Sequence, residues 1–237
     1  VMRIFWKEIA EVNKEENYNK MGQLYSKVSK VLFFSTTFTV LGMVPWASEI
    51  LSITAGEAYL GGLITFSLML MYPIHQSLGV LSNTMLYATS NTKLILWIHS
   101  STLISGLVLT YIILAPSDAR FPGFNLSSVG LAVKYLIVQV IFVTIAHWLI
   151  CRKYGWSHNI LYQVAIFLGI LAVGFGSFFI SSQMLYFLPL FIRIILYSIL
   201  YVSLIMIFAK KNLHLIGLTT EDITIAKNFI KSYKDSS

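Results

Sequence analysis

The stretch from Ala58 to Thr92, AYLGGLITFSLMLMYPIHQSLGVLSNTMLYATSNT, contains no Asp, Glu, Lys or Arg, and the way it crosses a membrane decides the fold. One crossing needs about 20 mostly apolar residues, so this stretch can form one long helix or two short ones. With one helix, almost all loop Lys and Arg residues fall on one side; with two helices they divide between both sides, against the positive-inside bias. The sequence therefore predicts one helix over 59–88, kinked at Pro73, whose ring removes an intrahelical hydrogen bond.

The composition of the whole chain is that of a membrane protein. Its 237 residues are 57% hydrophobic and 11% charged, with a mean hydropathy of +0.74, whereas soluble domains have about 45–50% apolar and about 25% charged residues. We predict an all-α integral membrane protein, a bundle of six transmembrane helices. The predicted order is a cytoplasmic linker with an amphipathic helix over 1–27, spans over 28–48, 59–88, 94–115, 126–150, 159–180 and 184–208, and a basic cytoplasmic tail over 209–237.

The Lys and Arg residues outside the spans set the predicted orientation. Fourteen lie on one side: six from Arg3 to Lys30, the last of them in the first turn of the first span, then Lys93, Arg152 with Lys153, and five in the tail. Only Arg120 lies in a loop on the other side. Because basic loops stay in the cytoplasm, both ends of the chain are predicted to be cytoplasmic. The predicted outer connections are loops over 46–58 and 116–125 and a tight turn over 181–183.

The first thirty residues are polar and charged, and they lack the apolar core of a cleavable signal peptide. Asn17 is expected to cap a cytoplasmic helix that continues into the first span. The chain starts at Val1 without an initiator Met. We therefore expect it to be the interior part of a longer protein.

Several classes of function find no support in the residue patterns. The basic residues lie beside apolar spans and form no aromatic-interleaved patch, so nucleic-acid binding is not expected. The single Cys151 permits no intrachain disulfide, and the His residues have no metal-ligand or catalytic spacing. There is no Gly-rich phosphate loop and no Ser/His/Asp arrangement. We therefore predict no catalytic residues, no metal, no cofactor and no enzymatic activity.

The ionisable residues within the predicted spans are all basic. No Asp or Glu lies well inside a span, although ion-coupled pumps and exporters usually have a carboxylate there. Lys134 and Arg193 do lie within spans, where a cation in a wet cavity would suit an anionic substrate. Lys134 can alternatively snorkel to the outer headgroups, and Arg193 can alternatively bond neighbouring carbonyls.

A polar cluster follows Pro73, and from it we select Gln76 and Asn83 as candidate substrate-binding residues beside Lys134 and Arg193. Residues of this kind can line a path for sugars. They can equally satisfy the carbonyl that proline leaves unbonded, or hydrogen-bond to adjacent helices.

The order of short motifs along the chain carries a resemblance. They are IFWKEIA (4–10), LYSKV (24–28), EIL (49–51), GEAY (56–59), QSLG (76–79), MLYAT (85–89), NTK (91–93) and VGLAVK (129–134). In order, spacing and predicted sidedness, residues 3–208 resemble the polysaccharide (O-antigen, lipid-linked oligosaccharide) flippase family of the multidrug/oligosaccharidyl-lipid/polysaccharide exporter superfamily.

The resemblance implies a fold, a substrate and a location. Members of the family have two helical lobes around a central cavity, so this chain would be the C-terminal half, and its partners would be the missing N-terminal lobe and the lipid bilayer. The substrate would be an anionic lipid-linked oligosaccharide of the undecaprenyl-pyrophosphate type. The location would be the cell (inner or plasma) membrane of a bacterium or archaeon, in surface polysaccharide biosynthesis.

Two other functions remain open on the sequence alone. A multidrug-type exporter of the same superfamily is disfavoured because the spans contain no carboxylate. A membrane enzyme of polysaccharide assembly, such as an acyltransferase or a sugar polymerase, would need convergent ionisable groups or a long external loop, and the chain offers neither.

Overall fold

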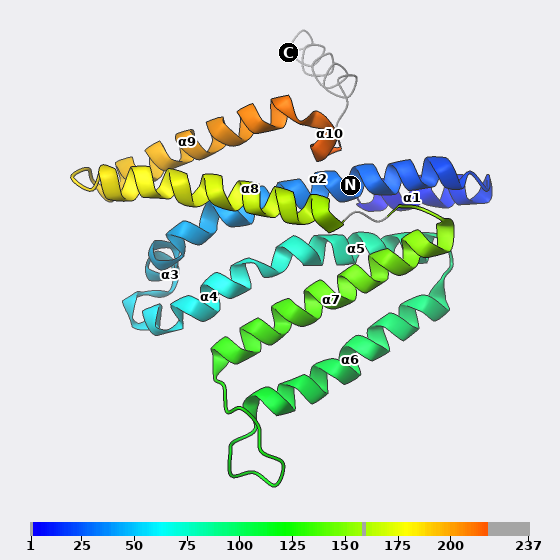
Figure 1. The fold of residues 1–237 in the computed structure, drawn as a ribbon, viewed down its shortest axis with the longest axis horizontal. Coiled ribbons are helices and arrows are strands. Elements are labelled where there is room, and N and C mark those ends of the chain that lie inside the picture. The colour runs from blue at the N-terminus through cyan, green and yellow to red at the C-terminus, as the bar shows by residue number, and fades with distance from the viewer. Residues whose placement is uncertain (1, 158–159, 218–237) are drawn as a thin grey trace.

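The computed structural model describes residues 2–157 and 160–217, and all its regular elements are helical (Figure 1). The α-helices are α1 (Met2–Lys14), α2 (Tyr18–Met43), α3 (Ala47–Ala55), α4 (Leu63–Leu70), α5 (Tyr72–Ala88), α6 (Thr92–Leu114), α7 (Ser128–Tyr154), α8 (Ile160–Phe178), α9 (Leu190–Lys211) and α10 (Leu213–Ile216). Short 3-10 segments cover Val44–Trp46 and Glu57–Gly62, and a π-helical segment covers Phe179–Met184.

Six helical segments are long and apolar enough to cross a membrane, which confirms the predicted all-α membrane fold. Each overlaps one predicted span, and the stretch around Pro73 counts as one crossing. The six segments are Tyr18–Ala55, Glu57–Ala88, Thr92–Leu114, Ser128–Tyr154, Ile160–Gln183 and Leu190–Lys211.

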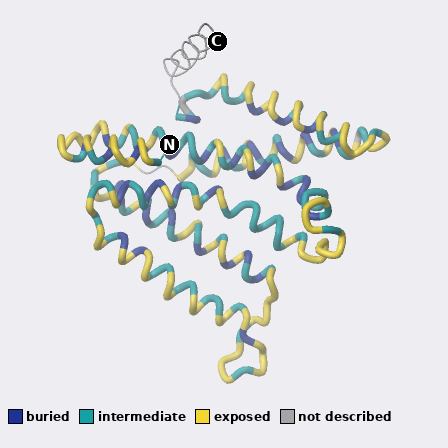
Figure 2. Tube along the Cα trace, turned by 180° about the vertical axis from the view of Figure 1, so that it is seen from behind, coloured by how far each residue is buried: buried dark blue, intermediate teal, exposed yellow. Residues whose placement is uncertain are grey.

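Helices α2, α5 and α7 form the centre of the bundle, and the other long helices pack on them or at its edges. Helix α2 packs on α5 and α8, while α7 packs on α5 and α6. Figure 1 places α9 at one edge and α6 at the opposite edge, and both helices are largely exposed in Figure 2, whereas buried positions gather on the inner helices. In a bilayer the apolar exposed faces of α6 and α9 lie against lipid or against another part of the protein.

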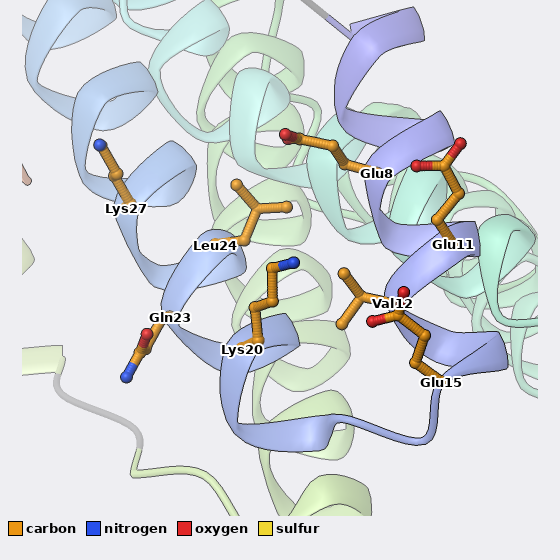
Figure 3. Close-up of a pocket in the computed structure, with 8 residues that line it drawn as sticks. All are labelled: Glu8, Glu11, Val12, Glu15, Lys20, Gln23, Leu24 and Lys27. Carbon is orange, nitrogen blue, oxygen red and sulfur yellow. The ribbon is translucent and has the colours of Figure 1, made fainter.

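The N-terminal arm is a helical hairpin. The Asn17 side chain accepts a hydrogen bond of 3.1 Å from the Lys20 backbone N–H, which confirms the predicted cap at the start of α2. Helix α1 buries one apolar stripe, Phe5, Ile9 and Val12, against α2 and α5. Figure 3 shows the groove of about 340 Å³ that remains between the two helices, with Glu8, Glu11 and Glu15 on the α1 wall and Lys20, Gln23 and Lys27 on the α2 wall.

Two predicted outer connections have a different structure. The predicted loop over 46–58 is mostly helix α3, and Trp46 is buried, with its ring 5.1 Å from that of Phe178 and 5.6 Å from that of Tyr197. The indole therefore packs between helices, which gives the segment a core to fold against. The turn predicted over 181–183 is π-helical, and α9 begins only at Leu190, after Pro189, because proline disfavours helix in the residue before it.

The predicted helix over 59–88 is interrupted close to its centre, at Met71. Helix α4 ends at Leu70 and α5 begins at Tyr72, with Pro73 exposed in the first turn of α5. Proline has no N–H to donate to the carbonyl four residues earlier, and its ring crowds that carbonyl, so the ladder is broken around Met71. The Met71 N–H instead bonds the Leu68 carbonyl at 3.0 Å.

Candidate functional site

A cavity of about 270 Å³ lies between α5, α6 and α7, inside the membrane-spanning part of the chain, and apolar side chains such as Val80, Ile98 and Phe142 share its lining with polar ones. Its polar lining combines amides, hydroxyls and one imidazole, and none of these groups is a carboxylate or an amine. The polar side chains are Tyr72, Gln76 and Asn83 from α5, His99 and Thr102 from α6, and Gln139 from α7.

Helical periodicity puts these groups on facing surfaces. On α5, Tyr72, Gln76 and Asn83 are separated by four and seven residues, so their side chains share one face. Gly79 lies on the same face, and a Cβ there would be only 3.1 Å from a methyl of Val143. The missing side chain therefore lets α5 approach α7 closely, as small residues do between membrane helices.

The cavity groups are only partly bonded within the chain. The Tyr72 hydroxyl donates a long hydrogen bond of 3.4 Å to Oε1 of Gln139. Within the described residues, the side chains of Gln76, Asn83 and His99 have no hydrogen bond to another residue, and Gln76 and His99 are exposed. These amides and the imidazole can therefore donate to and accept from a bound molecule.

Lys134 lies on α7 but does not line this cavity. Its side chain is 6% exposed, and its ammonium donates a 2.8 Å hydrogen bond to Oγ1 of Thr110 on α6. The nitrogen also lies 4.0 Å from the ring centre of Tyr135. No carboxylate of the described residues forms an ion pair with it. Five residues separate Lys134 from Gln139, roughly 7.5 Å along the helix axis.

Arg193 lies on α9, away from the cavity. Its Nη1 is 3.5 Å from the carbonyl oxygen of Ser182, in the π-helical segment that precedes α9. Its Nε is buried without a hydrogen-bond partner in the described part of the chain. This position fits the alternative left open by the sequence, that Arg193 bonds a neighbouring carbonyl.

Comparison of the chain with protein-family models, with curated proteins and with solved structures finds no match. The described residues also contain no group of three His, Cys, Asp or Glu side chains that could hold a metal ion. The geometry of the cavity and the neighbouring lysine is therefore the basis for a function.

Sequence reasoning selected Gln76 and Asn83, which line the same cavity, but it missed the lining residues that α6 and α7 contribute. His99, Thr102 and Gln139 belong to spans that are apolar on most sides, so their sequence gives little sign of which face turns inward. The sequence did contain one signal for them, namely that they are uncharged polar residues within long apolar spans. Such side chains are costly to expose to lipid and therefore tend to face other helices.

Proposed function

We propose that this chain is the C-terminal half of a transporter that moves an anionic lipid-linked oligosaccharide, of the undecaprenyl-pyrophosphate type, across the cell membrane for surface polysaccharide synthesis. The observation that carries the proposal is the cavity of uncharged polar groups, with a buried cation one helical turn and a half away on α7. The family resemblance of residues 3–208 supplies the identity of the substrate.

The chemistry of the lining suits sugars. The hydroxyl groups of a sugar both donate and accept hydrogen bonds. The amides of Gln76, Asn83 and Gln139 can do the same. Because these groups are neutral, they bind a hydroxyl without holding it as tightly as an ion pair would, and a transporter must also release its cargo. The missing N-terminal lobe would form the opposite wall of the passage.

Lys134 would act on the pyrophosphate through its field. Its ammonium is bonded to the neutral Thr110 hydroxyl, so its positive charge is not cancelled by a carboxylate among the described residues. Charges buried in a low-dielectric region are screened much less than charges in water. A positive charge on the helix that contributes Gln139 to the cavity would favour an anionic lipid head over a cationic drug.

The absence of acids separates this proposal from an ion-coupled drug exporter. Glu49 and Glu57 lie in the helical segments at the predicted outer side, and Asp118 follows α6. The described spans contain no other Asp or Glu. A proton or sodium site built from a membrane carboxylate would have to come from the other lobe.

A transport assay tests the proposal. The full-length protein, with its N-terminal lobe, is reconstituted in vesicles together with a fluorescent polyprenyl-diphosphate oligosaccharide, and movement between leaflets is followed by loss of fluorescence to an external quencher. We expect faster movement than in protein-free vesicles, and no movement of fluorescent phosphatidylcholine. Transport of a cationic dye without movement of the oligosaccharide lipid would favour the drug exporter instead.

A further inference from the structure

The neighbouring ends of α6 and α7 carry a cluster of bases and aromatic rings on the predicted cytoplasmic side. We define the α7 basic patch as Lys93, Arg152, Lys153, Trp148 and Tyr154. All three basic side chains are exposed, and among the described residues none of them forms an ion pair. The patch is thus a concentration of positive charge that the described part of the chain does not neutralise.

Arg152 makes a cation–π contact with an aromatic ring that lies deeper in the span. Its guanidinium carbon is 5.2 Å from the ring centre of Trp148, four residues earlier on α7. The indole is 44% exposed, so it has a free surface at the level of the membrane interface, where tryptophan is enriched. In this cation–π contact the donors at the edge of the guanidinium can still bond an anion.

Lys153 is positioned by the turn between α5 and α6. Its ammonium donates a hydrogen bond to Oδ1 of Asn91, and it lies 5.7 Å from the ring centre of Tyr154. The Asn91 amide in turn donates a 3.0 Å bond to the Tyr154 hydroxyl. Asn91 precedes Lys93 by two residues, so this network brings the basic end of α7 to the basic start of α6.

We propose that the α7 basic patch binds the phosphate of an anionic phospholipid headgroup in the cytoplasmic leaflet. A guanidinium fork matches two phosphate oxygens, and an adjacent ammonium adds a point charge. The exposed rings of Trp148 and of Trp97, one turn into α6 from Lys93, offer apolar surface to the glycerol and the upper acyl chains. Basic clusters at this depth on the cytoplasmic side attract anionic lipids. This inference requires a membrane protein but does not depend on the proposed transport.

The end of α9 provides a matched control. Lys210 and Lys211 are also consecutive, exposed bases at the predicted cytoplasmic end of a span. Within the described residues they have no stacked aromatic ring and no side-chain hydrogen bond. If anionic lipid is attracted to any exposed basic residue, removing either pair should lower lipid affinity equally. If the aromatic rings and Asn91 form a specific site, only removal of the pair on α7 should lower it.

The test is native mass spectrometry of the full-length protein in detergent, titrated with dioleoyl phosphatidylglycerol or with dioleoyl phosphatidylcholine. We expect Arg152→Gln with Lys153→Gln to weaken the apparent affinity for phosphatidylglycerol by about tenfold. Lys210→Gln with Lys211→Gln should change it by less than about twofold. Arg152→Lys keeps the charge but loses the planar fork, so its loss of affinity for phosphatidylglycerol should lie between these two values. This variant replaces the double variant in the test if the double variant fails to fold.

Three results would overturn the proposal. They are equal losses in the α7 and α9 variants, equal binding of phosphatidylcholine to the unaltered protein, and displacement of the lipid by inorganic phosphate at concentrations comparable to the lipid. The last result would mean that the patch binds free phosphate and gains no affinity from the rest of the lipid.

Discussion

The Tyr25 hydroxyl lies 2.8 Å from Nδ1 of His147, and this contact joins α2 to α7 across 122 positions of the sequence. The two rings are stacked with their centres 5.2 Å apart. The same hydroxyl lies 2.9 Å from Oγ of Ser82, so α5 belongs to the network as well. Three of the helices that frame the bundle therefore meet at one buried oxygen.

Loss of this oxygen should destabilise the fold. We expect Tyr25→Phe to lower the free energy of unfolding by about 1–2 kcal/mol, because the hydroxyl shared by Ser82 and His147 is removed while the ring is kept. The measurement is thermal unfolding in detergent. Tyr87→Phe is the control, because Tyr87 is exposed and its hydroxyl has no hydrogen bond to the described residues. Equal midpoints for the two variants would contradict the prediction.

Two tyrosine side chains of α9, Tyr197 and Tyr201, reach α2 at Gly42. A Cβ at this position would lie 2.7 Å from the Tyr201 ring, and the Gly42 carbonyl accepts a 2.8 Å bond from the Tyr197 hydroxyl. We expect Gly42→Ala to lower stability by about 1–3 kcal/mol. At Gly106 a Cβ meets nothing within 4 Å, so Gly106→Ala should be neutral or stabilising, since alanine favours helix. The measurement is the free energy of unfolding of both variants by chemical denaturation. An equal loss of stability in the two would show that packing at Gly42 is not the cause.

The cavity can be tested without changing its charge. Asn83→Leu keeps an approximate volume but removes an amide that has no partner among the described residues, so we expect transport to fall about tenfold with unchanged stability. Gln163→Leu alters a half-buried amide on α8, outside this cavity, and should leave transport unchanged. Surface polysaccharide at equal membrane abundance is the measurement. Normal polysaccharide in the Asn83 variant would remove the cavity from the proposed path.

The charge of Lys134 gives a second functional test. Because the proposal needs a positive field beside the cavity, Lys134→Arg in the full-length protein should retain part of the activity, whereas Lys134→Gln should lose most of it. Both variants are compared at equal membrane abundance, with Lys210→Gln as a control for a lysine at the exposed end of α9. If the glutamine variant makes normal surface polysaccharide, Lys134 is a structural residue between α6 and α7.

The orientation in the membrane is a separate prediction. In a chain whose buried Cys151 is replaced by Ala, Lys93→Cys should react with a membrane-impermeant maleimide only from the cytoplasm, and Asp118→Cys only from outside. The physical reason is the fourteen-to-one division of loop Lys and Arg residues. Reaction from the opposite side at either position would overturn the orientation.

The sequence by itself determined the number of helices that are long and apolar enough to span a membrane. The backbone must satisfy its own hydrogen bonds in lipid, and the hydrocarbon core has a set thickness, so an apolar run of sufficient length forms a helix wherever it packs. The residues that end such a helix also lie close to it in the sequence. The predicted end of the second span agrees with the end of α5 at Ala88, and the Asn17 cap depends only on residues within one turn.

Only the tertiary structure decided which side chains meet. In lipid, all faces of a helix such as α6 or α8 can be apolar, so periodicity does not reveal the inward face. Tyr25 contacts His147 because of helix packing, and Asn83 and Gln139 line one cavity for the same reason. Lys134 lies against Thr110 for the same reason, since the fit between facing side chains, and not the hydrophobic effect, selects how membrane helices pack.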